Sequence, residues 1–144
     1  MSEQWWALIG VVLGGVLGGG GQVVAGSLQE KRRHQQWLRE RQVDVYQMFI
    51  TEWRKHYDAL VDYVFDDHGL WGEPPEDYLV PVFARADDVE IFGSQASIAA
   101  AKLASKRLMT FWSADRASRE EKHTGAKEAI ADFTNQARRD LKVG

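Results

Sequence analysis

The hydrophobic positions of this chain follow two patterns, one continuous and one periodic. Residues Trp5 to Leu28 form a run of 24 residues without a charge, built mainly from Leu, Ile, Val, Ala and Gly. As a helix, such a run reaches about 36 Å, which is enough to cross the hydrocarbon core of a bilayer. The sequence therefore predicts that residues 1–28 form a short N-terminal tail and a transmembrane helix.

The periodic pattern begins after this run. From Gln29 to Phe65, apolar residues recur at steps of three, four or seven, which is the spacing of an amphipathic helix. Because no Gly or Pro interrupts this stretch, we expect the membrane helix to continue into a long stalk helix, with a bend near Gly26. The apolar stripe consists of Leu38, Val45, Phe49, Trp53, Tyr57, Leu60 and Val64.

Turn-forming residues divide the remainder into shorter helices. The Gly- and Pro-rich residues 66–76 predict a loop, and a second helix is expected to start near Pro75 or Asp77 and to end at Phe92. Pro81, in or near its first turns, is able to delay or kink this start. Gly93 and Ser94 predict a stop followed by an N-cap, a third helix from Gln95 to Trp112 or as far as Lys122, a break at 123–125 and a last helix over 126–141. The residues expected to pack are Val82, Phe83, Ala86, Val89, Ile91, Phe92, Ile98, Ala101, Leu103, Leu108, Phe111, Trp112, Ile130, Phe133, Ala137 and Leu141.

These elements predict an all-α protein, because no segment has the alternating pattern of a strand. The expected architecture is an N-terminal transmembrane helix that continues into a long amphipathic helix, which packs in an antiparallel helical bundle. The helical domain covers residues 29–144, with the stalk helix at 29–65, the loop at 66–76 and the other helices at 77–144.

Flanking charges predict the orientation of the membrane helix. Five basic residues lie within about 15 residues of its C-terminal end and none precedes it, so the positive-inside rule places the N-terminus outside and residues 29–144 in the cytoplasm. The expected localisation is a cell inner or plasma membrane, crossed once. The residues predicted to contact the bilayer interface and its anionic headgroups are Trp5, Trp6, Lys31, Arg32, Arg33 and Trp37.

Two other interpretations of the uncharged run remain open. A cleaved signal peptide would carry positive charge before the apolar stretch, whereas the preceding residues 1–4 contain no basic residue. The segment Val23-Val24-Ala25 nevertheless resembles a weak cleavage site. A buried helix of a soluble protein is the second interpretation, because the many glycines make the run only moderately apolar.

Eight of the 13 glycines lie in this run, and their spacing predicts self-association. Gly10, Gly14 and Gly18 recur every four residues, and Gly15 and Gly19 form a second row beside them. Rows of small residues let a second helix approach closely, so a homo-oligomer through the span is expected. A membrane-perturbing or pore-forming assembly would use the same surface, and glycine is also common in membrane helices that do not associate.

Charge and composition restrict the chemistry of the helical domain. The chain has no cysteine, which excludes disulfides, thiolate zinc sites and cysteine nucleophiles, and which fits a reducing compartment. The net charge of −3 hides a strong segregation: residues 29–41 carry +3, residues 42–92 carry −9 and residues 93–144 carry +4. A pairing of the basic late helices with the acidic middle of the chain is expected.

No residue cluster predicts a catalytic, cofactor or metal site. Asp58, Asp62 and Asp66 share one helical face, but a di-metal carboxylate bundle needs Glu-x-x-His motifs, and Lys55 stands three residues after Glu52. These residues, the Glu52–His56 pair and the sequence Asp66-Asp67-His68 are expected to be solvated or to cap turns. The four histidines form no recognisable catalytic motif.

Nucleic-acid binding is not expected either, although residues 102–122 are rich in lysine and arginine. Asp115, Glu120 and Glu121 dilute this positive charge, and no aromatic residues are interleaved with it beyond Phe111 and Trp112. The expected role of these basic residues is to form a solvated helix face.

A Trp-flanked, Gly-rich span followed by Lys31-Arg32-Arg33 and Arg39-Glu40-Arg41 resembles a broad set of uncharacterised bacterial single-span membrane proteins. Tyr46, Phe49 and the segment ARADDVEIFGS at residues 84–94, before an Ala-rich helix, carry the same resemblance. It implies a helical cytoplasmic domain and no assigned activity. The inner-membrane spanins of phage lysis have a similar plan, but their stalk faces the periplasm, whereas the charges here favour the cytoplasm.

The sequence therefore predicts a non-enzymatic, membrane-anchored helical scaffold or adaptor that acts through self-association or through an unknown protein partner. The alternative is a phage- or toxin-type membrane-active protein, spanin-like or pore-forming, that uses the glycine-rich span. A membrane-tethered enzyme with a dispersed site is the third class.

Overall fold

The structure is a computed structural model that describes residues 3–66 and 74–142, with side chains described from Gly26 onward. It contains four helices, α1 (Glu3–Phe65), α2 (Val80–Phe92), α3 (Gln95–Trp112) and α4 (Arg119–Lys142). No strand occurs in the described ranges. The predicted all-α class and the helical bundle are therefore confirmed.

The chain divides into two compact units, the first ending at Leu38 and the second beginning at Arg39. Helix α1 contributes to both units. The predicted stalk residues 29–38 belong to the first unit, and the bundle is built from residue 39 onward.

The backbone of the predicted span, Trp5–Leu28, is helical and lies within α1. The side chains of its residues up to Ala25 lie outside the described residues. This group includes Trp5, Trp6 and the glycines at positions 10, 14, 15, 18 and 19. Among the residues whose side chains are described, no helix has enough length and apolar character to cross a bilayer.

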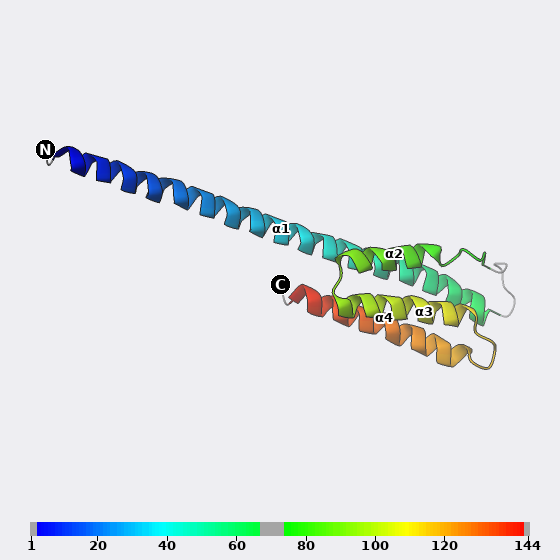
Figure 1. The fold of residues 1–144 in the computed structure, drawn as a ribbon. Helices are drawn as coiled ribbons and strands as arrows, with labels where there is room; N and C mark the ends of the chain where they lie inside the picture. Colours follow the sequence, from blue (N-terminus) through cyan, green and yellow to red (C-terminus); the bar gives the residue numbers. More distant parts are fainter. Residues whose placement is uncertain (1–2, 67–73, 143–144) are drawn as a thin grey trace. The chain divides into compact units, whose positions relative to one another are not determined.

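Within the second unit, successive helices run in opposite directions (Figure 1). Helix α3 packs against both α2 and α4. Because the direction alternates, the start of this unit and the end of α4 lie at the same end of the bundle. The Arg39 guanidinium donates a hydrogen bond to the Leu141 carbonyl at this end, so it caps the last turn of α4.

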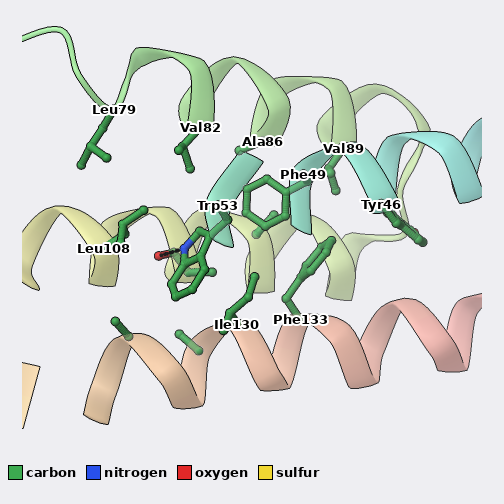
Figure 2. Close-up of a cluster of buried hydrophobic side chains, with 14 of the residues drawn as sticks. Tyr46, Phe49, Trp53, Leu79, Val82, Ala86, Val89, Leu108, Ile130 and Phe133 are labelled. Carbon is green, nitrogen blue, oxygen red and sulfur yellow. Dashed lines mark hydrogen bonds between the residues drawn. The ribbon is translucent and has the colours of Figure 1, made fainter. Parts of the chain in front are cut away.

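The core of the bundle receives side chains from all four helices (Figure 2). Phe49 and Trp53 of α1 are almost completely buried, and the Phe49 ring meets Phe133 of α4 edge-on with 4.7 Å between centroids. The Trp53 indole N–H donates to the Ala104 carbonyl of α3 over 3.0 Å, which satisfies the polar edge of this buried ring. Helix α2 adds Val82, Ala86 and Val89.

Small residues are part of the buried surface of both α3 and α4. Ala101 and Ala104 of α3 are fully buried, as is Ala126 of α4. Ser105 is also buried in α3, and its hydroxyl has no hydrogen-bond partner among the described residues.

Helix α2 begins later than predicted. Residues 75–79 form turns, in which the Tyr78 amide donates to the Pro75 carbonyl and the Val80 amide donates to the Asp77 carbonyl. The start near Pro75 or Asp77 is not observed; Pro81 delays it, because a proline fits a helix only within its first turn. With Pro81 at the second helical position, the helix begins at Val80.

Helix α4 also differs from the prediction, because it starts at Arg119 and passes through residues 123–125 without a break. The Asp115 carboxylate accepts hydrogen bonds from the Ser118 amide, at 2.9 Å, and from its hydroxyl, forming the turn before the helix. The negative charges of Glu120 and Glu121, in the first turn, then interact favourably with the positive end of the helix dipole. The helical penalty of Gly125, about 1 kcal/mol, is too small to break so long a helix.

The predicted end of α1 at Phe65 is confirmed, and α3 runs from Gln95 to Trp112, the shorter of its two expected extents. Ser94 is the N-cap of α3, with its hydroxyl accepting the Ser97 amide over 3.1 Å. A Cβ atom on Gly93 would lie 2.7 Å from the Val89 carbonyl oxygen, so a residue without a side chain lets the chain turn tightly between α2 and α3.

Candidate functional site

The residues predicted to meet headgroups are exposed where they are described. Every residue from Gly26 to Arg41 is exposed, including Lys31, Arg32 and Arg33. The Trp37 side chain is 46% exposed and stacks on the His34 ring with 6.0 Å between centroids. This stretch of α1 therefore presents cations beside uncovered apolar groups, the composition that suits an anionic interface.

The acidic residues considered from sequence do not form a metal site in the described part of the chain. Asp58, Asp62 and Asp66 are exposed. No group of three or more His, Cys, Asp or Glu side chains has metal-binding geometry in the described part of the chain. Asp67 and His68 lie outside the described residues.

His56 is a buried residue of the bundle rather than a solvated one, so the expectation for the Glu52–His56 pair was wrong. It is 5% exposed, and its Nδ1 lies 2.9 Å from the Glu52 carbonyl and 3.4 Å from Glu52 Oε1. The Tyr78 ring meets it edge-on at 4.8 Å. These contacts position the turn before α2 against α1.

A polar cluster that the sequence did not reveal joins three helices at the end of the bundle where residue 39 lies. Three hydroxyl groups, those of Tyr46, Ser94 and Ser97, donate to Oδ2 of Asp140, at 2.6 Å for Tyr46 and 2.7 Å for Ser94. The other carboxylate oxygen accepts Gln136 Nε2 at 2.9 Å. We call these five residues the Asp140 cluster.

The Asp140 cluster shifts two pKa values. Burial of the Asp140 carboxyl opposes ionisation, but the hydrogen bonds from Ser97, Tyr46, Ser94 and Gln136 outweigh it and lower its pKa. Burial, together with the hydrogen bond to Asp140, raises the pKa of Tyr46. The cluster therefore holds an ionised carboxylate between neutral hydroxyls, an arrangement that fastens α4 to α1 and α3.

One sequence feature does point toward this cluster. Asp140 stands in the last turn of α4, where a negative charge faces the unfavourable end of the helix dipole. A carboxylate at this position needs hydrogen-bond donors to stabilise its charge. The sequence does not identify the hydroxyl groups that donate, because they come from segments 43 to 94 residues away.

An aromatic cluster lies toward the opposite end of the bundle, around His123 of α4. The Tyr57 hydroxyl and His123 Nε2 are 2.6 Å apart and share a hydrogen bond. Phe65 and Phe111 enclose the imidazole, with ring centroids at 5.3 and 5.4 Å. Burial, followed by the nearby Asp58 charge, raises the pKa of Tyr57. The cluster joins the end of α1 to the start of α4.

A groove of about 540 Å³ lies between α3 and α4 on the outside of the bundle. Its lining mixes one guanidinium with carboxylates and a few apolar groups: Leu103, Arg107, Glu120, Glu128, Ala129 and Asp132. In the described part of the chain this groove contains no nucleophile paired with a base, so it has no recognisable catalytic chemistry.

The basic and acidic segments meet where Lys102 of α3 pairs with Glu90 of α2 at 2.9 Å. The pairs Lys55–Glu52 and Arg85–Asp88 are local contacts within a helix turn.

Comparison of the chain with models of protein families, with curated proteins and with solved structures gives no match. The functional proposal therefore rests on the residues and their geometry.

Proposed function

We propose that this protein is a membrane-anchored, non-enzymatic helical scaffold. Residues 5–28 cross the bilayer once, the N-terminus lies outside, and the bundle lies in the cytoplasm. The glycine rows bring two or more copies together, and the bundle then contacts a protein partner or another copy. The observation that carries this proposal is the uncharged 24-residue run followed directly by an exposed basic stretch.

The bundle supports a scaffold because its described residues supply a hydrophobic core of their own. The second unit begins at Arg39, and its buried residues all come from residue 45 onward. A soluble protein would normally use 24 uncharged residues in its core, since their burial is its main source of stability. With the core filled by other residues, a bilayer is the environment that suits the run.

The basic stretch supports the orientation. Each cation near an anionic leaflet contributes about 1 kcal/mol, so Lys31, Arg32 and Arg33 hold this side of the span at the cytoplasmic face. The exposed Leu28 and Trp37 side chains add apolar and amphipathic contact at the interface.

Two lysines placed in the middle of the run test the anchor. The variant V12K/L13K is expected to move from the membrane to the soluble fraction, because each central lysine costs roughly 2.5–3.5 kcal/mol on insertion. The matched control Q35K/Q36K adds the same charge to the exposed stretch and is expected to stay in the membrane. Fractionation with alkaline washing measures both variants, and equal retention of V12K/L13K would contradict the anchor.

Protease treatment of sealed inverted and right-side-out vesicles tests the sidedness in the same preparations. The bundle is expected to be cut only in inverted vesicles. Cleavage from the outer face would overturn the orientation, and lysis or depolarisation of the host on expression would instead support the membrane-active alternative.

The glycine rows have their own test. Replacing Gly14 and Gly18 with leucine is expected to weaken self-association of the intact chain in membranes, because the larger side chains fill the surface along which two helices approach. Replacing Leu13 and Leu17 with isoleucine is the control, since it leaves the rows intact. A membrane-association reporter measures the oligomer, and an unchanged signal for G14L/G18L would exclude these rows as the contact.

A further inference from the structure

The outer face shared by α2 and α3 carries exposed apolar and charged residues on two adjacent helices. We call it the α2–α3 face; it consists of Val80, Phe83, Asp87, Glu90 and Ile91 of α2 with Lys102, Lys106 and Met109 of α3, all of them exposed. Its four large apolar side chains are 60% (Val80), 38% (Phe83), 71% (Ile91) and 45% (Met109) exposed. Apolar groups gathered on one face of a small protein are typical of a contact surface.

Two contacts fix the register of the antiparallel helices on this face. Glu90 pairs with Lys102 at 2.9 Å, and the Tyr78 ring lies 6.2 Å from the Trp112 ring. Seven residues make about two helical turns. Phe83 lies seven residues before Glu90, and Met109 lies seven residues after Lys102, so on antiparallel helices both steps run in the same direction. Phe83 and Met109 therefore lie at one height on adjacent helices.

The charges follow the same register. Asp87 is three residues before Glu90, and Lys106 is four residues after Lys102, so this acid and this base also lie at nearly one height. On the α2–α3 face, the acidic groups therefore come from α2 and the basic groups come from α3.

Such a face is complementary to itself. A two-fold axis parallel to the helices places α2 of one copy over α3 of the other and keeps every residue at its own height. Phe83 then meets the partner's Met109, and Asp87 meets the partner's Lys106. Acid therefore faces base at the Asp87–Lys106 level, and apolar group faces apolar group at the Phe83–Met109 level.

We propose that the α2–α3 face binds the same face of a second copy of this chain. The inference rests on the proposed function in one respect: a two-fold axis along the helices keeps the Arg39 ends of both bundles at the same end, as two chains anchored in one membrane require. A face-to-face pair about a perpendicular axis would place these ends on opposite sides.

The face is too small to hold two free chains together stably, so the membrane anchor supports the contact. Helix α2 is about 20 Å long, and two packed helices are about 20 Å wide, which gives roughly 400 Å² per copy. The total of about 800 Å² is less than the roughly 1,200 Å² of a stable interface between free proteins. Confinement of two chains by a shared membrane contact raises their effective concentration, so that a small interface is occupied.

The absence of cysteine makes a direct experiment available. Full-length chains carrying Phe83→Cys and, under a different tag, Met109→Cys are co-expressed, and their membranes are treated with a short thiol cross-linker. The mixed product is expected to form several-fold more than the product of Phe83→Cys with Leu103→Cys. Leu103 is a matched control because it is also in α3 and also 45% exposed, but it faces the α3–α4 groove.

A charge exchange tests the specific pairing. In chains with the cysteine pair, Asp87→Lys or Lys106→Glu alone is expected to lower cross-linking about fivefold or more, because each change places two like-charged pairs in the dimer. The two changes together in every chain are expected to restore it. Asp58→Lys, an exposed change on α1, is the control expected to have no effect.

The outcomes separate this proposal from the anchor. Equal products with Leu103→Cys and Met109→Cys, or no recovery in the charge-exchanged chain, would overturn the α2–α3 contact, and capture of another protein at Phe83→Cys in place of the second copy would also overturn it. The share of protein in the membrane fraction of the same samples reports independently on the anchor. A soluble chain that still gives the Phe83–Met109 product would retain the contact and refute the anchor.

Discussion

Replacing Trp53 with alanine is expected to destabilise the bundle by about 3–5 kcal/mol. Trp53 is 1% exposed, stacks on Tyr57 at 4.9 Å and donates its indole N–H to the Ala104 carbonyl of α3. Its removal leaves a cavity between α1 and α3 and deletes that hydrogen bond. Since the free energy of unfolding of a domain of this size is about 5–15 kcal/mol, the substitution removes a large fraction of it.

Urea unfolding of the intact chain in detergent, followed by helical circular dichroism, measures this effect as a lower midpoint. Trp37→Ala is the matched control, because Trp37 is 46% exposed and lies before the bundle, so its change is expected to be within about 0.5 kcal/mol. Equal midpoints for the two variants would contradict the central position of Trp53.

Replacing Asp140 with asparagine is expected to cost about 1.5–3 kcal/mol, because hydrogen bonds to a charged group are stronger than neutral ones and three hydroxyls converge on this carboxylate. The amide of asparagine also brings hydrogens into a site that needs an acceptor. Asp132→Asn is the control on the same helix, since Asp132 is exposed.

The dependence on pH distinguishes this mechanism from simple loss of packing. The pKa of Asp140 is lowered by folding, so its contribution is present above the ordinary carboxyl pKa of about 3.9 and is lost as the pH falls through the lowered value. The pKa of Tyr46 is raised, so its contribution is lost as the pH rises above about 10. The gap in stability between the native chain and D140N should therefore narrow in acid; a gap that stayed constant would contradict the charged cluster.

Local patterns in the sequence predicted the helices well and their exposed faces less well. The three- and four-residue spacing in α1 identified Phe49, Trp53 and Leu60, all of which are buried. In α2 and α3 the same reasoning counted Phe83, Ile91 and Leu103 as packing residues, but they are exposed. A short helix buries one narrow stripe, here Val82, Ala86 and Val89, and hydrophobicity alone does not exclude an apolar residue from the opposite side.

The Asp140 and His123 clusters could not be predicted from the sequence, for a different reason. The Asp140 and His123 clusters join residues that are far apart in sequence, and their partners follow from how the helices meet. The break expected at residues 123–125 shows the same limit. A histidine and a glycine favour a turn locally, but contacts of His123 with Tyr57, Phe65 and Phe111 favour a continuous helix.

The hydrogen bond from Arg39 to the last turn of α4 has a practical consequence for anyone who labels this protein. Since that turn lies beside the point where α1 enters the bundle, a fluorescent protein fused directly after α4 would crowd the same end and strain the cap. The turn between α3 and α4 lies at the other end of the bundle (Figure 1), and its residue Ser113 is exposed and precedes the Asp115–Ser118 hydrogen bonds. A small epitope inserted after Ser113 would leave those hydrogen bonds within one segment and would report on the protein with less disturbance.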